Sequence, residues 1–215
     1  IPYKNERADG LFLQDWVRHQ PFYSGEIYLF GSSYTASVHF VTAPFADDIK
    51  GAVLRVMETG KYNGNYRNGF YKMGLHGGWY VDMYKKKSIR NKNYTPESFN
   101  ILPLSEFSKT VFGENDENLN EIFKHPNKND PFWNHDYQDG KRLGVVNNAN
   151  IPILFVTAFY DIFTGGIFDM WNELDDETKA ISALAVHPFN HGCHSELEPI
   201  SFEDGNIDNE YLNYP

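Results

Sequence analysis

Runs of apolar residues alternate with helical patterns at both ends of this chain. Short runs rich in β-branched and aromatic residues predict strands at Glu26–Phe30, Ile49–Met57, Ile151–Thr157 and Lys179–Val186. Apolar positions at helical spacing predict helices over Glu6–Gln20, from just after Ser33 to about Thr42, and over Phe163–Leu174. Strand, helix and strand at this spacing are typical of βαβ units, so we expect an α/β fold with a mainly parallel sheet.

The block from Glu58 to Leu143 has a different character. It lacks the strand–helix alternation of its flanks, and Gly69–Tyr84 within it is rich in Tyr, Trp, Met and Gly. We interpret residues 58–143 as an inserted helical cap. Residues 1–57 and 144–215 would then form the α/β core.

Composition narrows the class of protein. With 22% charged and 41% apolar residues, the 215-residue chain is typical of a soluble globular protein. Its net charge of −10 argues against nucleic acid and anionic membranes as partners. No run is long enough to span a membrane. The single Cys193 excludes an internal disulfide and fits a reducing compartment, so we expect a cytoplasmic protein.

The segment Glu26–Thr42 carries the first candidate chemistry. A strand meets Gly31, then Ser32 and Ser33, and a helix can begin at once. This order is that of a nucleophile elbow, in which a serine sits on a tight turn between strand and helix. The helix N-terminus would direct N–H groups towards an oxyanion formed beside the serine. Thr35 stands where the Gly-x-Ser-x-Gly pattern has its second glycine.

Two further residues complete a candidate catalytic triad. Asp161 follows the strand Ile151–Thr157, and His191 follows the strand Lys179–Val186. Ser33, Asp161 and His191 thus occur in the order of α/β-hydrolases, each after the carboxyl end of a predicted parallel strand. A serine nucleophile needs such a base, and the base needs a carboxylate to orient it.

Other interpretations of these residues stay open. Asp161 could instead serve only as the N-cap of the next helix. His187 and His194 compete with His191 as the base, and the three together could form a metal site, although the intervening Pro188 and Gly192 argue against helical ligand spacing.

Several segments together resemble the cocaine esterase / X-Pro dipeptidyl-peptidase family of α/β-hydrolases. They are Glu6–Gly10 with Asp15-Trp16 and Gln20-Pro21, Gly31–Tyr34, His125-Pro126 with Asp130–Trp133, Tyr160-Asp161-x-Phe163, and Pro188–His191. They extend over nearly the whole chain. The resemblance implies an α/β-hydrolase core with a helical cap and a serine hydrolase that cleaves an ester, amide or short peptide without a metal or other cofactor.

The resemblance also implies roles for particular residues. Ser33 would be the nucleophile, with Asp161 and His191 completing the triad, and the backbone N–H of Tyr34 would be one oxyanion donor. In the family a second donor comes from an upstream Tyr in a Pro-Tyr segment, for which Tyr3 is the candidate although it lies closer to Glu6 than expected.

The cap aromatics Tyr71, Trp79 and Tyr80 would shape the substrate pocket, or else pack within the cap. The family has more strands before the elbow, so the chain looks like the central portion of a longer protein. The alternative function is a catalytically silent, hydrolase-like binding module.

Overall fold

The structure, a computed structural model, describes residues 5–42, 45–85, 93–133, 151–192, 196–197 and 200–201. These residues divide into two compact units. The insert unit lies within Lys61–His135, and the sheet unit takes in the described residues up to Gly60 and from Ile151 onward. The first boundary lies close to the predicted residue 58, whereas residue 143 lies outside the described ranges. The assignment of the insert as a cap stays a prediction.

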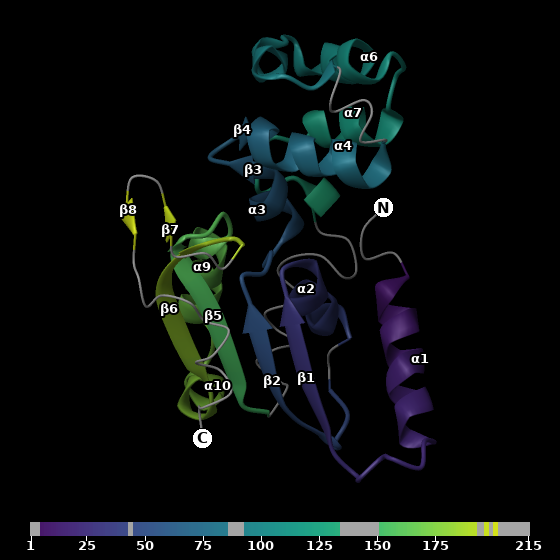
Figure 1. Ribbon diagram of the computed structural model, residues 1–215, viewed down its shortest axis with the longest axis vertical. Helices are drawn as coiled ribbons and strands as arrows, with labels where there is room; N and C mark the ends of the chain where they lie inside the picture. Colours follow the sequence, from purple (N-terminus) through teal and green to yellow (C-terminus); the bar gives the residue numbers. More distant parts are fainter. Residues whose placement is uncertain are drawn as a thin grey trace. The chain divides into compact units, whose positions relative to one another are not determined.

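The sheet unit contains a parallel sheet. Its elements are α1 (Glu6–Arg18), β1 (Ile27–Ser32), α2 (Tyr34–Val41), β2 (Ile49–Arg55), β5 (Ile153–Tyr160), α9 (Thr164–Glu173), α10 (Asp176–Ile181), β6 (Ala183–Asn190) and the hairpin β7 (Glu196–Leu197) with β8 (Ile200–Ser201). Within the described residues, one sheet has four strands in the order β1-β2-β5-β6, and each adjacent pair is parallel (Figure 1). The predicted α/β fold with a mainly parallel sheet is therefore confirmed.

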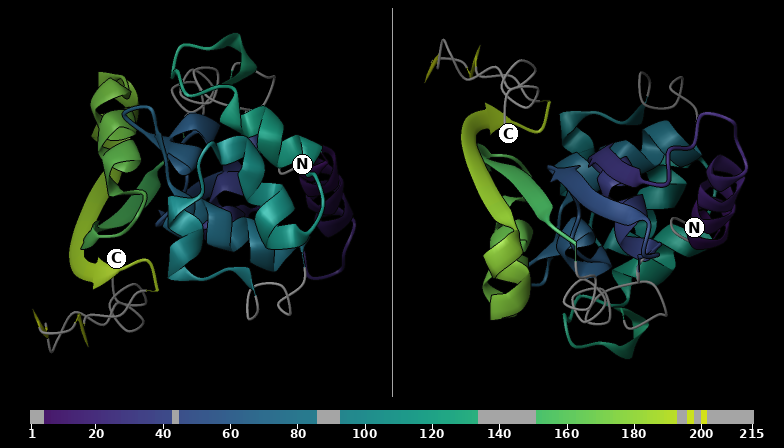
Figure 2. Two further views of the ribbon diagram at one scale, coloured as in Figure 1. Left: turned by 90° about the horizontal axis from the view of Figure 1, so that it is seen from above. Right: turned by 90° about the horizontal axis from the view of Figure 1, so that it is seen from below.

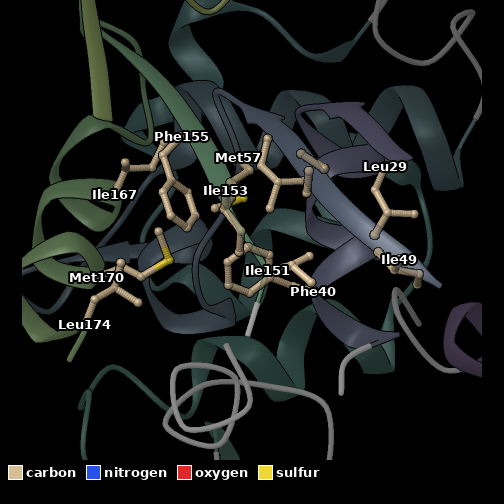
Figure 3. Close-up of a cluster of buried hydrophobic side chains, with 13 residues drawn as sticks. Leu29, Phe40, Ile49, Met57, Ile151, Ile153, Phe155, Ile167, Met170 and Leu174 are labelled. Atoms are coloured by element: carbon tan, nitrogen blue, oxygen red, sulfur yellow. The ribbon is translucent and has the colours of Figure 1, made fainter. Parts of the chain in front are cut away.

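One apolar cluster fixes two helices to the same face of this sheet (Figure 3). Its buried members include Leu29, Leu54, Ile153 and Phe155 from the strands, Phe40 from α2, Ile167 and Met170 from α9, and Leu174 at the C-cap of α9. Phe155 is fully buried and its ring lies 6.3 Å from that of Phe40. Because α2 and α9 each begin just after the carboxyl end of a strand, their packing holds both strand–helix turns in place.

The strand predicted at Lys179–Val186 is wrong in its bounds. Residues up to Ile181 form the helix α10, and β6 begins at Ala183 and continues to Asn190. The Asp175 carboxylate accepts a hydrogen bond from the Thr178 N–H at 2.7 Å, and this N-cap starts a helix at Asp176 that runs into the first half of the predicted strand. Pro188 is compatible with β6 because β6 is an edge strand among the described strands.

The insert unit is built from short helices around aromatic clusters. Its elements are α3 (Lys61–Asn65), the hairpin β3 (Tyr66–Arg67) and β4 (Phe70–Tyr71), the π-helical turn η1 (Met73–Gly77), α4 (Gly78–Tyr84), the 3-10 turns η2 (Pro96–Asn100) and η3 (Leu104–Glu106), α6 (Phe107–Phe112), α7 (Glu117–Phe123) and the 3-10 turn η4 (Pro131–Trp133). One cluster centres on Phe107 and another on Trp133. Across the described parts of both units, no helix combines the length and apolar character needed to cross a membrane.

A histidine joins two acidic side chains in the insert unit. His125 Nδ1 lies 2.9 Å from Asp130 Oδ2 and its Nε2 lies 3.1 Å from Glu121 Oε1, while the ring stacks on Phe132 at 4.1 Å. Both ring nitrogens face carboxylates, which favours the doubly protonated imidazolium. The hydrogen bond to Asp130, followed by that to Glu121, raises the pKa of His125.

We expect this pair of contacts to make stability fall as the pH rises above about 6.5, the ordinary pKa of histidine. A raised pKa in the folded state contributes stability that is complete below the unfolded pKa of His125 and is lost as the pH rises through the folded value. The thermal unfolding midpoint should therefore decline more steeply over this range in the wild type than in His125→Gln. The exposed His19 gives the matched control His19→Gln, which should follow the wild type. If the thermal unfolding midpoints of the wild type and of His125→Gln changed with pH in the same way, the expectation would be contradicted.

Candidate active site

Ser33 occupies a strained turn between β1 and α2. Its backbone has φ 55° and ψ −125°, a conformation that non-glycine residues rarely adopt. Its N–H donates to the Arg55 carbonyl at 2.9 Å, which ties the turn to the end of β2. The helix α2 begins directly after it at Tyr34. Ser33 thus lies between the carboxyl end of β1 and the start of α2, two elements that lie next to each other in Figure 1.

Gly31 is required by this turn. A Cβ atom at this position would lie 2.6 Å from the Ala36 nitrogen and 2.7 Å from its Cα. Both contacts are with backbone, which cannot move aside as a flexible side chain can. Strand and helix therefore approach each other as closely as they do only because residue 31 is glycine.

Gly31→Ala should lower the free energy of unfolding by about 3 kcal/mol because the added methyl overlaps the backbone of α2. Urea unfolding measures this. Gly165→Ala is the matched control, since nothing lies within 4 Å of its added Cβ and alanine is the better helix former. A Gly31→Ala variant as stable as Gly165→Ala would show that the close approach is absent.

Thr35 explains how the turn forms without the second glycine. Its hydroxyl accepts from the Ser32 N–H at 3.0 Å and donates to the Ser32 carbonyl at 2.7 Å. The side chain satisfies both backbone groups of the last residue of β1. A threonine in this place is therefore accommodated by local hydrogen bonds.

Strain at Ser33 has a measurable consequence. Glycine adopts a positive φ without the steric cost that a Cβ brings. We expect Ser33→Gly to be more stable than Ser33→Ala by about 1 kcal/mol, after allowance for the greater freedom of glycine in the unfolded chain. Urea midpoints of the two variants, both of which lack the hydroxyl, provide the comparison. Equal midpoints would mean that Ser33 carries no backbone strain.

Asp161 follows β5 directly, and its carboxylate is fully enclosed. The side chain has 0% exposure. One oxygen, Oδ2, accepts from the Phe163 N–H at 3.1 Å, and the other, Oδ1, lies 2.6 Å from His191 Nδ1. The two oxygens thus hold the start of α9 and the imidazole at once. The N-cap of α9 is Phe163, so Asp161 is not the N-cap that the sequence allowed; its carboxylate holds the turn before the helix and contacts His191 as well.

His191 lies between Asp161 and Ser33. The sequence predicts that the strand ends at Val186 and that His191 lies in a loop several residues further on. In the structure β6 extends to Asn190, so His191 is the first residue after the strand. Its Nε2 lies 2.9 Å from Ser33 Oγ, and its side chain is 31% exposed. A carboxylate only accepts hydrogen bonds, so His191 Nδ1 carries the proton that it donates to Asp161. In the neutral ring Nε2 then accepts a hydrogen bond from the Ser33 hydroxyl.

The structure therefore brings Ser33, His191 and Asp161 into one hydrogen-bonded chain. Their order is hydroxyl, imidazole and buried carboxylate, from the ends of β1, β6 and β5. Chemically, this arrangement can remove a proton from Ser33 and stabilise the positive charge that the ring then carries. The Tyr34 N–H is in the first turn of α2, and its part as an oxyanion donor stays a prediction.

The cap aromatics lie in the insert unit. Tyr80 is buried, and its hydroxyl donates to Asp116 Oδ1 at 2.7 Å. Tyr71 packs against the same cluster, and burial raises its pKa well above the ordinary value. Trp79 lies 5.4 Å from the His76 ring. Packing inside the unit accounts for the positions of Tyr71 and Tyr80, and a pocket role for the three residues stays a prediction.

Some candidates from the sequence fall outside the described residues. These are Tyr3 and His194. In the ranges that are described, no group of three or more His, Cys, Asp or Glu side chains has the arrangement needed to hold a metal ion.

Two contacts near the site were missed by the sequence analysis. The Phe163 N–H holds Asp161, and the Tyr34 hydroxyl donates to Glu6 Oε1. Both Glu6 and Phe163 lie in segments that carry the family resemblance, which is the one signal that could have drawn attention to them. Contacts between residues 28 positions apart leave no periodic pattern in the sequence.

Structural comparison identifies the fold of this chain. An aminopeptidase from the marine sediment archaeon Thaumarchaeota archaeon superposes with a TM-score of 0.67 at 18% identity, over 95% of this chain and 36% of its own. An acylaminoacyl peptidase of Pyrococcus horikoshii gives 0.50 at 12% identity, over 88% and 24%. This chain thus spans about a third of the first protein and a quarter of the second. The fold is that of an α/β-hydrolase.

The sequence itself gives the family. The family model described as X-Pro dipeptidyl-peptidase (S15 family) matches residues 2–193. The chain therefore belongs to the X-Pro dipeptidyl-peptidase (S15) family, as the resemblance predicted. No curated protein matches the chain in a sequence search.

Proposed function

We propose that the protein is a serine hydrolase that cleaves an ester, amide or short peptide through an acyl-enzyme. The observation that carries the proposal is the chain of contacts Ser33 Oγ–His191 Nε2–Asp161 Oδ1, at 2.9 and 2.6 Å, with Ser33 on a strained turn. Membership in a peptidase family supports the hydrolase class.

The first step forms the acyl-enzyme. Ser33 Oγ bonds to the carbonyl carbon of the substrate as its proton passes to His191 Nε2 and the carbonyl π electrons move onto oxygen. The Tyr34 N–H donates to this oxyanion. When the intermediate collapses, the bond to the leaving group breaks, and the leaving group takes the proton from His191.

The second step returns the enzyme to its starting state. Water gives a proton to His191 Nε2 as its oxygen adds to the acyl carbon, and the bond to Ser33 then breaks as Oγ recovers the proton. Throughout both steps Asp161 holds the Nδ1 proton and stabilises the imidazolium. These side chains carry every proton transfer, so the proposal requires no cofactor.

Substrate selection is assigned to the insert. The family description points to peptides with proline as their second residue, and we propose a small ester, amide or short peptide as the substrate. Residues 58–143 would act as the cap, with Tyr71, Trp79 and Tyr80 as candidate pocket residues. The alternative is the catalytically silent binding module.

Hydrolysis of p-nitrophenyl acetate distinguishes the two functions. We expect the folded chain to release p-nitrophenolate well above the rate of the same chain unfolded in urea, and to lose this activity after treatment with a fluorophosphonate. A folded chain that is no faster than the unfolded chain would contradict the hydrolase proposal and favour the binding module.

A further inference from the structure

A contact between α1 and α2 lies next to the nucleophile. The Tyr34 hydroxyl donates to Glu6 Oε1, so the first residue of α2 is joined to the first residue of α1. Both side chains are partly buried. Tyr34 is also the residue whose backbone N–H adjoins Ser33, and the contact therefore acts on the peptide that would bind an oxyanion.

Polar contacts and one close approach connect α1 to the rest of the sheet unit. Arg7 Nη1 donates to the Val41 carbonyl at the last residue of α2, at 2.7 Å. A Cβ on Gly10 would lie 2.6 Å from Thr42 Cγ2, so α1 also passes close to the end of α2. At its other end, Arg18 forms two hydrogen bonds with Asp48, each 2.7 Å long.

The apolar side chains of α1 contribute little burial. Leu11, Phe12, Leu13 and Trp16 are 39 to 72% exposed, and the buried residue of this helix is Gln14. The helix lies beyond the β1 edge of the sheet in each view (Figure 2). Within the described residues, polar contacts therefore set most of the position of α1. Among these contacts, the hydrogen bond between Tyr34 and Glu6 lies next to the turn at Ser33.

The orientation of the Tyr34 N–H depends on two neighbouring torsions. The Ser33–Tyr34 peptide plane is set by ψ of Ser33, which is −125° in a strained conformation, and by φ of Tyr34. Relaxation of Ser33 would rotate this plane and turn the N–H away from the oxyanion. The helix α2 has only eight residues, so its first turn gains from an external support.

From these contacts we propose that Glu6 and the Tyr34 hydroxyl form a brace that positions the Tyr34 N–H for the oxyanion. The inference rests on the proposed function. Glu6 is a positioning residue: it acts through Tyr34 and does not contact the reacting atoms. An oxyanion donor that is out of place lowers the rate by up to about a hundredfold, and a donor that is only held less firmly lowers it less.

Tyr34→Phe tests the brace because it removes the hydroxyl and keeps the ring and the backbone N–H. We expect kcat for p-nitrophenyl acetate to fall about tenfold with little change in KM. Tyr28→Phe is the matched control, because the Tyr28 hydroxyl donates to the exposed Glu26 at 3.2 Å, and it should retain wild-type kinetics.

An oxyanion-forming inhibitor separates positioning from general damage. Ser33 Oγ adds to the carbonyl carbon of a trifluoromethyl ketone, its proton passes to His191, and the hemiketal oxygen carries the negative charge beside the Tyr34 N–H. The inhibition constant should therefore rise about tenfold in Tyr34→Phe, in parallel with the loss of kcat. A merely structural effect would lower the folded fraction without changing this constant.

A double-mutant cycle links the two residues. Glu6→Ala should reproduce the loss in Tyr34→Phe, the double variant should be no worse than either single variant, and Glu6→Gln should recover part of the activity because its amide oxygen still accepts. Additive losses, or a Tyr34→Phe variant that matches Tyr28→Phe while the wild type is active, would overturn the brace alone. A wild type inert towards both ester and fluorophosphonate would overturn the proposed function and the brace with it.

Discussion

Ser33→Ala is expected to remove nearly all turnover of p-nitrophenyl acetate. Removing the nucleophile of such a triad lowers kcat by roughly 10⁶. His191 would then have no hydroxyl to activate, although its contact with Asp161 remains. Alanine keeps a Cβ at the same strained φ, so the turn is otherwise unchanged.

Ser32→Ala provides the matched control for this change. Ser32 is the adjacent serine at the end of β1, and its contacts with Thr35 are made by its backbone. Its alanine variant should keep wild-type turnover, and both variants should show the far-UV circular dichroism of the wild type. Equal activity of folded Ser33→Ala and Ser32→Ala would exclude Ser33 as the nucleophile.

Asp161→Asn is the second large effect that we expect. The amide can donate to His191 Nδ1, which moves the ring proton to Nε2, and Nε2 then cannot accept from Ser33. A tautomer change of this kind lowers kcat by about 10⁴ with little change in the fold. Steady-state kinetics on the ester measure it.

Asp169→Asn controls for the loss of an acidic residue in the same region. Asp169 is exposed on α9, and its amide variant should keep full activity. An Asp161→Asn variant that retains more than about a tenth of wild-type turnover would show that Asp161 only holds the turn before α9.

The fold around the elbow was predictable because each signal there is local. A strand run, Gly31 and a serine pair, followed by a helical segment, can be recognised without knowledge of distant contacts. The geometry at Gly31 gives the physical reason for the glycine, and the hydroxyl of Thr35 explains the departure from the expected pattern. The parallel sheet followed in the same way from βαβ spacing.

The segment before His191 was misread because its residues fit two structures. Lys179, Ala180 and Ile181 are compatible with either helix or strand, and the Asp175 cap that decides for a helix lies outside the predicted strand. The sequence therefore placed the strand too early and assigned its second half to a loop. The position of His191 after a strand did not depend on that error.

The contact between Glu6 and Tyr34 could not be predicted at all. Nothing in the periodicity of either helix indicates that their first residues meet, since the contact depends on how α1 passes α2. The family segments indicated that Glu6 was worth attention without indicating what it touches. Tertiary packing of this kind becomes visible only in the structure.

Peptide mapping of a fluorophosphonate adduct tests the central claim most directly. The folded chain is labelled and digested, and the modified residue is located by mass spectrometry. We predict one adduct per chain, on Ser33, and a much slower reaction in His191→Ala because the hydroxyl is no longer activated. An adduct on another residue, or none on a chain shown to be folded, would contradict the assignment of Ser33, His191 and Asp161 as a working triad.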